Sequence, residues 1–66
     1  MLELILYRQS PYTSSTYIRN EGRLETLDYM ADNSTAYYVA RRVLQIAGVD
    51  FEANETTVNP ETYDQE

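Results

Sequence analysis

The fold is decided by residues 32–48, DNSTAYYVARRVLQIAG, which carry the clearest helical pattern in the chain. Asp32, Asn33 and Ser34 are three successive candidates for the N-cap, the side chain that satisfies free N–H groups at a helix start. Apolar residues then recur at the three-four spacing of one helical face: Ala36, Val39, Ala40, Val43, Leu44 and Ala47. Gly48 follows where a left-handed residue ends a helix. Because so short a helix is unstable alone in water, we expect it to pack across a sheet.

Residues 2–8 are the most apolar strand candidate. Side chains alternate along a strand, so Leu4 and Leu6 would lie on one face, and Ile5 and Tyr7 on the other. Apolar residues on both faces are typical of a strand that is covered on both sides. We therefore expect this strand to be buried, at least in part, on both faces.

A β-hairpin is predicted next, with residues 20–22 as its loop. Gly22 can adopt the positive φ that closes such a turn. With this loop, Ile18 would face Leu24 on the neighbouring strand, and Leu27 would point to the opposite face. A shift of one residue would reverse these faces. The two strands of the hairpin are residues 16–19 and 23–27.

Residues 50–58 alternate weakly between two faces and are anchored only by Phe51. We expect an edge strand here, because acidic side chains on a strand discourage edge-to-edge aggregation. Pro60 ends the strand. Residues 1–59 are thus expected to form one domain, and residues 60–66 a flexible acidic tail.

Together these elements predict one small α+β domain with the order β-β-β-α-β. Three strands form an antiparallel meander, one helix packs across one face of the sheet, and a fourth short strand follows. A chain of 66 residues is too short for more than one domain. The expected core consists of apolar side chains from every element: Leu2, Leu4, Leu6, Ile18, Leu24, Val39, Val43, Leu44 and Phe51.

The negative charge is unevenly spread along the chain. Residues 1–49 hold five acidic residues and five arginines, whereas residues 50–66 hold six acidic residues and no basic one. The whole formal net charge of −6 therefore lies in the last segment. Such a segment is either a solvated tail or an acidic surface for a basic partner. Direct binding to nucleic acid is not expected, because phosphate contacts need clustered cations.

The side-chain inventory argues against an enzyme. The chain has no histidine, cysteine or lysine, so it lacks an imidazole base, a thiolate and a Schiff-base amine. One acidic series matches the liganding offsets of an EF-hand calcium loop: Asp50, Glu52, Asn54, Thr56, Val58 and Glu61. Glu55, however, stands where that loop needs glycine for its sharp turn. We therefore expect no catalytic residue, metal or cofactor.

Hydropathy gives no sign of a membrane protein. The longest apolar run is residues 4–7, far below the roughly 20 residues of a transmembrane span. The first residues lack a basic region, and Glu3 interrupts their apolar run, unlike a secretory signal. We expect a cytoplasmic protein that makes no membrane contact.

Two groups of residues are candidate contacts for a partner protein. On the helix, Tyr38, Arg41 and Arg42 point away from the predicted core stripe, and these residue types are enriched at interface hot spots. The same residues can instead shield the core or pair with nearby acids. The candidates in the acidic segment are Asp50, Glu52 and Glu55.

Part of the chain resembles the phage antirestriction proteins, which are acidic DNA mimics. The resemblance lies in Ala31-Asp32-Asn33, Tyr37-Tyr38, Gly48-Val49-Asp50-Phe51-Glu52 and Pro60. It implies carboxylates that stand where DNA phosphates would, on a surface offered to a DNA-binding enzyme. Arg41 and Arg42 depart from this pattern. The carboxylates that could serve are Asp50, Glu52 and Glu55, with Asp28 and Asp32. Short, acidic, cysteine-free chains also resemble anti-CRISPR proteins as a class.

Residues 24–62 also resemble the first half of a glutaredoxin. The resemblance lies in Tyr29, Ser34, Tyr37, Arg41-Arg42, Leu44, Ala47-Gly48-Val49, Phe51-Glu52 and Asn59-Pro60-Glu61. Ser34 and Tyr37 stand where that family has its Cys-x-x-Cys pair, so such a protein would be redox-inactive. The resemblance implies that residues 24–29 pair in parallel with residues 51–57.

We therefore expect a non-enzymatic protein that binds another protein with a basic surface. The specific expectation is a phage-type inhibitor of a host nucleic-acid-handling or defence protein, acting in the host cytoplasm. The alternative is a small assembly subunit that forms homo-oligomers through strand 2–8. A redox-inactive glutaredoxin-like fragment is a second alternative.

Overall fold

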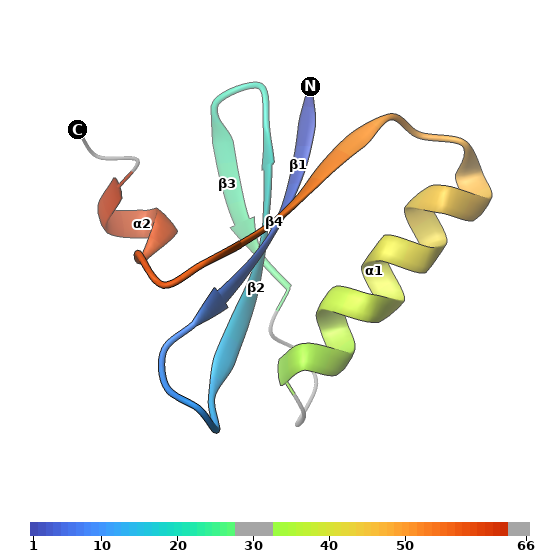
Figure 1. Cartoon of the computed structure of the whole chain (residues 1–66). Coiled ribbons are helices and arrows are strands. Elements are labelled where there is room, and N and C mark those ends of the chain that lie inside the picture. The colour runs from blue at the N-terminus through green and yellow to red at the C-terminus, as the bar shows by residue number, and fades with distance from the viewer. Residues whose placement is uncertain (28–32, 64–66) are drawn as a thin grey trace.

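The computed structural model describes residues 1–27 and 33–63. The strands are β1 (Leu2–Arg8), β2 (Ser14–Asn20), β3 (Arg23–Thr26) and β4 (Phe51–Thr56), and the helices are α1 (Asn33–Ala47) and α2 (Pro60–Tyr63). The strands form one sheet in the order β3-β2-β1-β4 (Figure 1). β1 pairs antiparallel with β2 and parallel with β4, and β2 pairs antiparallel with β3. The predicted α+β class is confirmed, with a mixed sheet and the additional short helix α2.

β1 lies at the centre of the fold because it is apolar on both faces. Leu4 and Leu6 are fully buried on the face that α1 covers, and Ile5 is buried on the opposite face. Figure 1 shows α1 on one side of the sheet and α2 on the other. The expectation that this strand is covered on both faces is confirmed. Both edges of β1 are occupied, by β2 and β4, so the structure contradicts the expected contact between copies through this strand.

β4 lies beside β1, not beside β3. Phe51 pairs with Leu2 along the parallel ladder, while β3 lies at the opposite edge of the sheet. The pairing of residues 24–29 with residues 51–57 that the glutaredoxin resemblance implies is therefore wrong, and residues 28 and 29 lie outside the described residues. A neighbouring strand on each edge helps to bury the apolar side chains of β1, whereas the polar β3 remains mostly exposed.

The β2–β3 hairpin turns on two residues rather than three. Glu21 and Gly22 both have positive φ, 53° and 81°, as in the type I′ turn that suits a two-residue hairpin. Leu24 therefore pairs with Arg19 rather than with Ile18. The predicted register is wrong by one residue, so Leu24 and Ile18 lie on opposite faces of the sheet.

α1 ends at a glycine, as the sequence predicts. Gly48 has a φ of 72°. Its N–H donates to the Gln45 carbonyl over 3.2 Å, and the Val49 N–H donates to the Leu44 carbonyl over 3.1 Å. These two hydrogen bonds form a Schellman motif. The helix begins within the predicted capping run, although Asp32 lies outside the described residues.

The buried face of α1 differs from the predicted one. Tyr37 is buried in the core against Leu4 and Leu6, whereas Val39 and Val43 are 48% and 56% exposed. The prediction that these two valines belong to the core is wrong. Burial of a tyrosine ring hides more apolar surface than burial of a valine, which favours the observed rotation of the helix. Partly buried side chains complete the core: Ile18, Leu27, Ala40 and Phe51.

The segment that we predicted as a flexible tail begins with α2. The Asn59 side-chain oxygen accepts a hydrogen bond from the Glu61 N–H over 2.9 Å and so caps this helix. Pro60 stands at the first helical position, where its missing N–H costs nothing, and it is buried. The Tyr17 hydroxyl donates to the Glu61 carboxylate over 3.1 Å. The tail prediction for residues 64–66 lies outside the described residues.

Truncation of Leu6 tests the central place of β1. Because Leu6 is fully buried, we expect Leu6→Ala to lower the free energy of unfolding by about 2–5 kcal/mol. The control Ile46→Ala changes a side chain that is 73% exposed and should alter this free energy by less than about 0.5 kcal/mol. Urea denaturation followed by circular dichroism measures both. Equal effects would contradict the role of β1 as the core strand.

Candidate functional site

The three acidic candidates lie on or beside β4. Asp50 precedes the strand, and Glu52 and Glu55 are exposed within it. Phe51 packs against the core under α1, and side chains alternate along a strand, so Glu55 lies on the α1 face and Glu52 on the opposite face. The structure thus brings these carboxylates to one edge of the sheet but not to one face.

Arg8 compensates part of this charge. Its Nε donates to Oε1 of Glu55 over 3.2 Å, and about half of each side chain is exposed. Asp50 and Glu52 make no ion pair or side-chain hydrogen bond with any other described residue. Of the three acidic candidates, Asp50 and Glu52 therefore have no cationic partner among the described residues, whereas Glu55 has Arg8.

The helix candidates lie on the outer side of α1. Arg41 and Arg42 are exposed, and Tyr38 is 54% exposed. Neither arginine forms an ion pair within residues 1–27 and 33–63. The Tyr38 ring meets the buried Tyr37 ring edge to face, with 5.2 Å between the ring centroids. Tyr38 is therefore held at the surface by a residue that is anchored in the core.

An apolar strip on α1 was not predicted as a surface. Val39, Val43 and Ile46 are spaced by four and three residues, so they lie along one side of the helix. All three are exposed, Ile46 to 73%. The sequence pattern places Val39 and Val43 on an apolar face of the helix, but it predicts that this face packs on the sheet. Grouped exposed apolar side chains mark an interaction surface.

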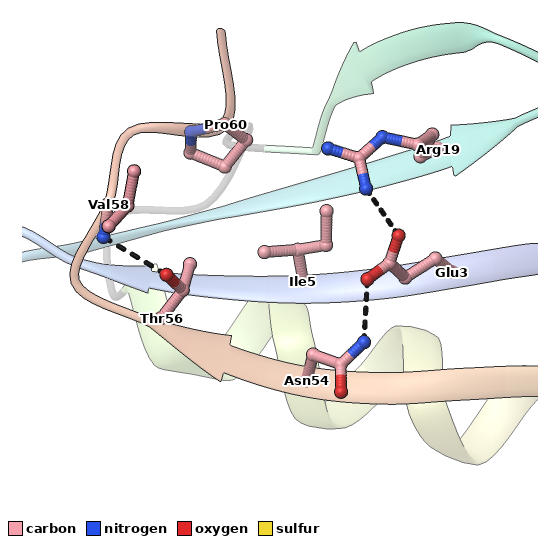
Figure 2. A pocket seen from close by; sticks show the side chains of 7 residues that line it. All are labelled: Glu3, Ile5, Arg19, Asn54, Thr56, Val58 and Pro60. Carbon is pink, nitrogen blue, oxygen red and sulfur yellow. Dashed lines mark hydrogen bonds and ion pairs between the residues drawn. The ribbon is translucent and has the colours of Figure 1, made fainter. Parts of the chain in front are cut away.

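A pocket of about 190 Å³ lies on the face of the sheet opposite α1. Figure 2 shows Ile5 at its centre, between the Val58 and Pro60 side chains and the polar group around Glu3. Sequence reasoning missed this pocket because its residues come from distant parts of the chain. The residues that line it are Glu3, Ile5, Arg19, Asn54, Thr56, Val58 and Pro60.

Glu3 links three strands at one end of this pocket. Its Oε1 accepts a hydrogen bond from Arg19, and its Oε2 accepts one from the Asn54 amide over 2.6 Å (Figure 2). The side chains of Glu3 and Arg19 are 23% and 26% exposed. Because both carboxylate oxygens are engaged by donors on neighbouring strands, this arrangement gives Glu3 a structural role.

The residues that match the calcium-loop offsets do not form a loop. Residues 51–56 are the strand β4, whose successive side chains point to opposite faces and cannot surround one ion. Within the described ranges, no three acidic side chains are grouped so as to hold a metal ion. The described part of the chain also contains no helix that is long and apolar enough to cross a membrane.

Comparison with known proteins gave no match. No family model matches the chain, and no curated protein or solved structure matches it significantly.

Removal of Glu3 tests its structural role. Because two donors hold a carboxylate that is only 23% exposed, we expect Glu3→Ala to lower the free energy of unfolding by about 1–3 kcal/mol. Glu55→Ala removes the exposed pair with Arg8 and should cost about 0–1 kcal/mol. Urea unfolding measures both variants. A cost for Glu3→Ala no larger than that for Glu55→Ala would refute the structural role.

Proposed function

We propose that this chain is a non-enzymatic protein-binding module that binds a basic surface of another protein. The contact is the β4 edge, by which we mean the outer edge of β4 with Asp50, Glu52 and Glu55. One observation carries this proposal. Asp50 and Glu52 are exposed and lack a cationic partner among the described residues, whereas Glu3 and Glu55 on the same sheet are each paired with an arginine.

The chemistry of the chain supports binding rather than catalysis. The sequence supplies no histidine, cysteine or lysine for proton transfer or covalent catalysis. Glu3 is the carboxylate among the pocket-lining residues, and both its oxygens are engaged. A partner protein, by contrast, needs only an accessible surface of complementary charge.

Charge contributes to binding of the partner in two ways. Segment 50–66 contains six acidic residues and no basic one. The field of these charges attracts a basic partner at long range and speeds association. Close contact then pairs Asp50 and Glu52 with cations. Both contributions weaken as salt screens the charges.

The finer proposal is a phage-type inhibitor that acts in the host cytoplasm on a nucleic-acid-handling or defence protein. Proteins that bind nucleic acids carry the clustered cations that such an acidic edge complements. The resemblance to antirestriction proteins falls on Asp50 and Glu52, which lack a cationic partner among the described residues. Asp28 and Asp32 lie outside the described residues, so this proposal does not depend on them.

Charge reversal at Glu52 tests the proposed contact. We expect Glu52→Lys to reduce partner capture from a lysate of the native host at least about tenfold, because it removes one favourable pair and adds a repulsion. Glu55→Lys should have a smaller effect, since Arg8 already compensates Glu55. Glu21→Lys makes the same change of net charge in the exposed β2–β3 turn and serves as the control. Equal loss in Glu52→Lys and Glu21→Lys would refute the β4 edge as the contact.

A homo-oligomeric assembly subunit is a second candidate function, favoured by the apolar strip on α1. Val39, Val43 and Ile46 together expose apolar surface that a second copy could cover. This contact replaces the one expected through strand 2–8, which lies inside the sheet.

The oligomeric state decides this second candidate. If α1 mediates assembly, light scattering should give a dimer or larger species, and Val43→Asp should convert it to a monomer, since a buried charge opposes association. Val58→Asp is the matched control, because Val58 is 55% exposed and lies outside α1. A wild-type monomer at all concentrations tested would exclude the candidate.

A further inference from the structure

Within residues 1–27 and 33–63, the backbone along the outer edge of β4 has no partner strand. β4 stands at the end of the strand order, and its ladder runs to β1 alone. In a parallel pair, alternate residues direct both N–H and C=O away from the neighbouring strand. No other described residue forms a backbone–backbone hydrogen bond with β4. The chain thus presents a row of donors and acceptors that an added strand could satisfy.

Access to this edge is open on the described part of the surface. Residues 52–55 are all exposed. α1 packs mainly on β1 and β2 and reaches β4 at Phe51. Ala53 lies on the α1 face of the sheet but is exposed. The strand at the other edge, β3, has only four residues, against six in β4. Of the two edges, β4 offers the longer ladder.

Charge disfavours a second copy as the occupant of this edge. In a centred antiparallel pair of two β4 strands, Glu52 of each copy would lie directly opposite Glu55 of the other. Like charges that face each other across strands are destabilising. The same two positions would favour a strand that carries cations.

We propose that the β4 edge binds an extended basic segment of the partner protein as an additional strand of the sheet. This inference rests on the proposed function and states how the contact is made. Backbone hydrogen bonds supply affinity, and the cations of the segment face Glu52 and Glu55. Because these glutamates are three residues apart, their side chains point to opposite faces of the sheet. The segment therefore carries two lysines or arginines three positions apart.

The two cation positions are not equivalent. Glu55 is paired with Arg8 over 3.2 Å, so a cation of the segment must compete with Arg8 there. Glu52 has no such competitor among the described residues. We expect the position that faces Glu52 to demand a cation more strongly than the position that faces Glu55.

Synthetic peptides test this mode of binding. The probe is a short peptide of threonine and valine with two lysines three positions apart, titrated into the full chain at low ionic strength. Two-dimensional NMR should show saturable shifts of the β4 amides. A peptide with glutamates in place of the lysines, or with the lysines four positions apart, should bind at least about tenfold more weakly. Glu52→Lys should weaken the lysine peptide by a similar factor.

Backbone methylation of the peptide gives the decisive result. In an added strand, only alternate N–H groups of the peptide point toward β4. N-methylation of one alternate set should abolish binding, and N-methylation of the other set should leave it almost unchanged. Equal tolerance of both sets, or no saturable shift of the β4 amides, would overturn strand addition.

The outcomes also separate this inference from the proposed function. If Glu52→Lys abolishes capture of the natural partner but methylation shows no alternation, the acidic contact stands and strand addition fails. If methylation alternates but Glu52→Lys leaves partner capture unchanged, strand addition stands and the proposed function fails.

Discussion

The burial of β1 on both faces is the constraint on which the rest of the structure depends. Leu4 and Leu6 require a cover on one face and Ile5 on the other, and a chain of this length has few elements to supply both. α1 provides the first cover, and the segment around Pro60 provides the second. Because β1 pairs with β2 and β4, and β3 pairs with β2, β4 lies at an edge of the sheet, where its residues 52–55 are exposed. The candidate contact surface is thus a consequence of how the core is closed.

Features set by local sequence could be predicted. The end of α1 could be predicted because it requires a positive φ, which glycine adopts readily and few other residues do. Gly48 has this conformation. The hairpin position also follows from local sequence, but its register does not. A two-residue turn requires Glu21 as well as Gly22 to adopt a positive φ, an uncommon conformation for a residue with a side chain. Pairing across the whole β2–β3 ladder stabilises that conformation, and this pairing is not visible in the turn residues.

Features that depend on distant pairing could not be predicted. The apolar residues of α1 cover a broad arc, and periodicity alone does not say which part meets the sheet. The buried ring of Tyr37 fixes the rotation and leaves Val43 exposed. The contact between Arg8 and Glu55 joins residues that are 47 positions apart, and it depends on the placement of β4 beside β1. The sequence therefore indicates where the net charge lies, but not which carboxylates are already compensated.

The same carboxylates have two effects on the free edge of β4. An unpaired strand edge attracts any other exposed strand, including one of the same protein, and small domains have little stability to spare for misassembly. Negative charge at positions 52 and 55 raises the free energy of pairing between copies and lowers it for a basic strand. The same negative charges therefore repel a second copy of β4 and attract a basic strand. Protection against aggregation and selection of a partner have one electrostatic cause. An edge protected by proline would block both classes of strand, whereas an acidic edge blocks only one of them.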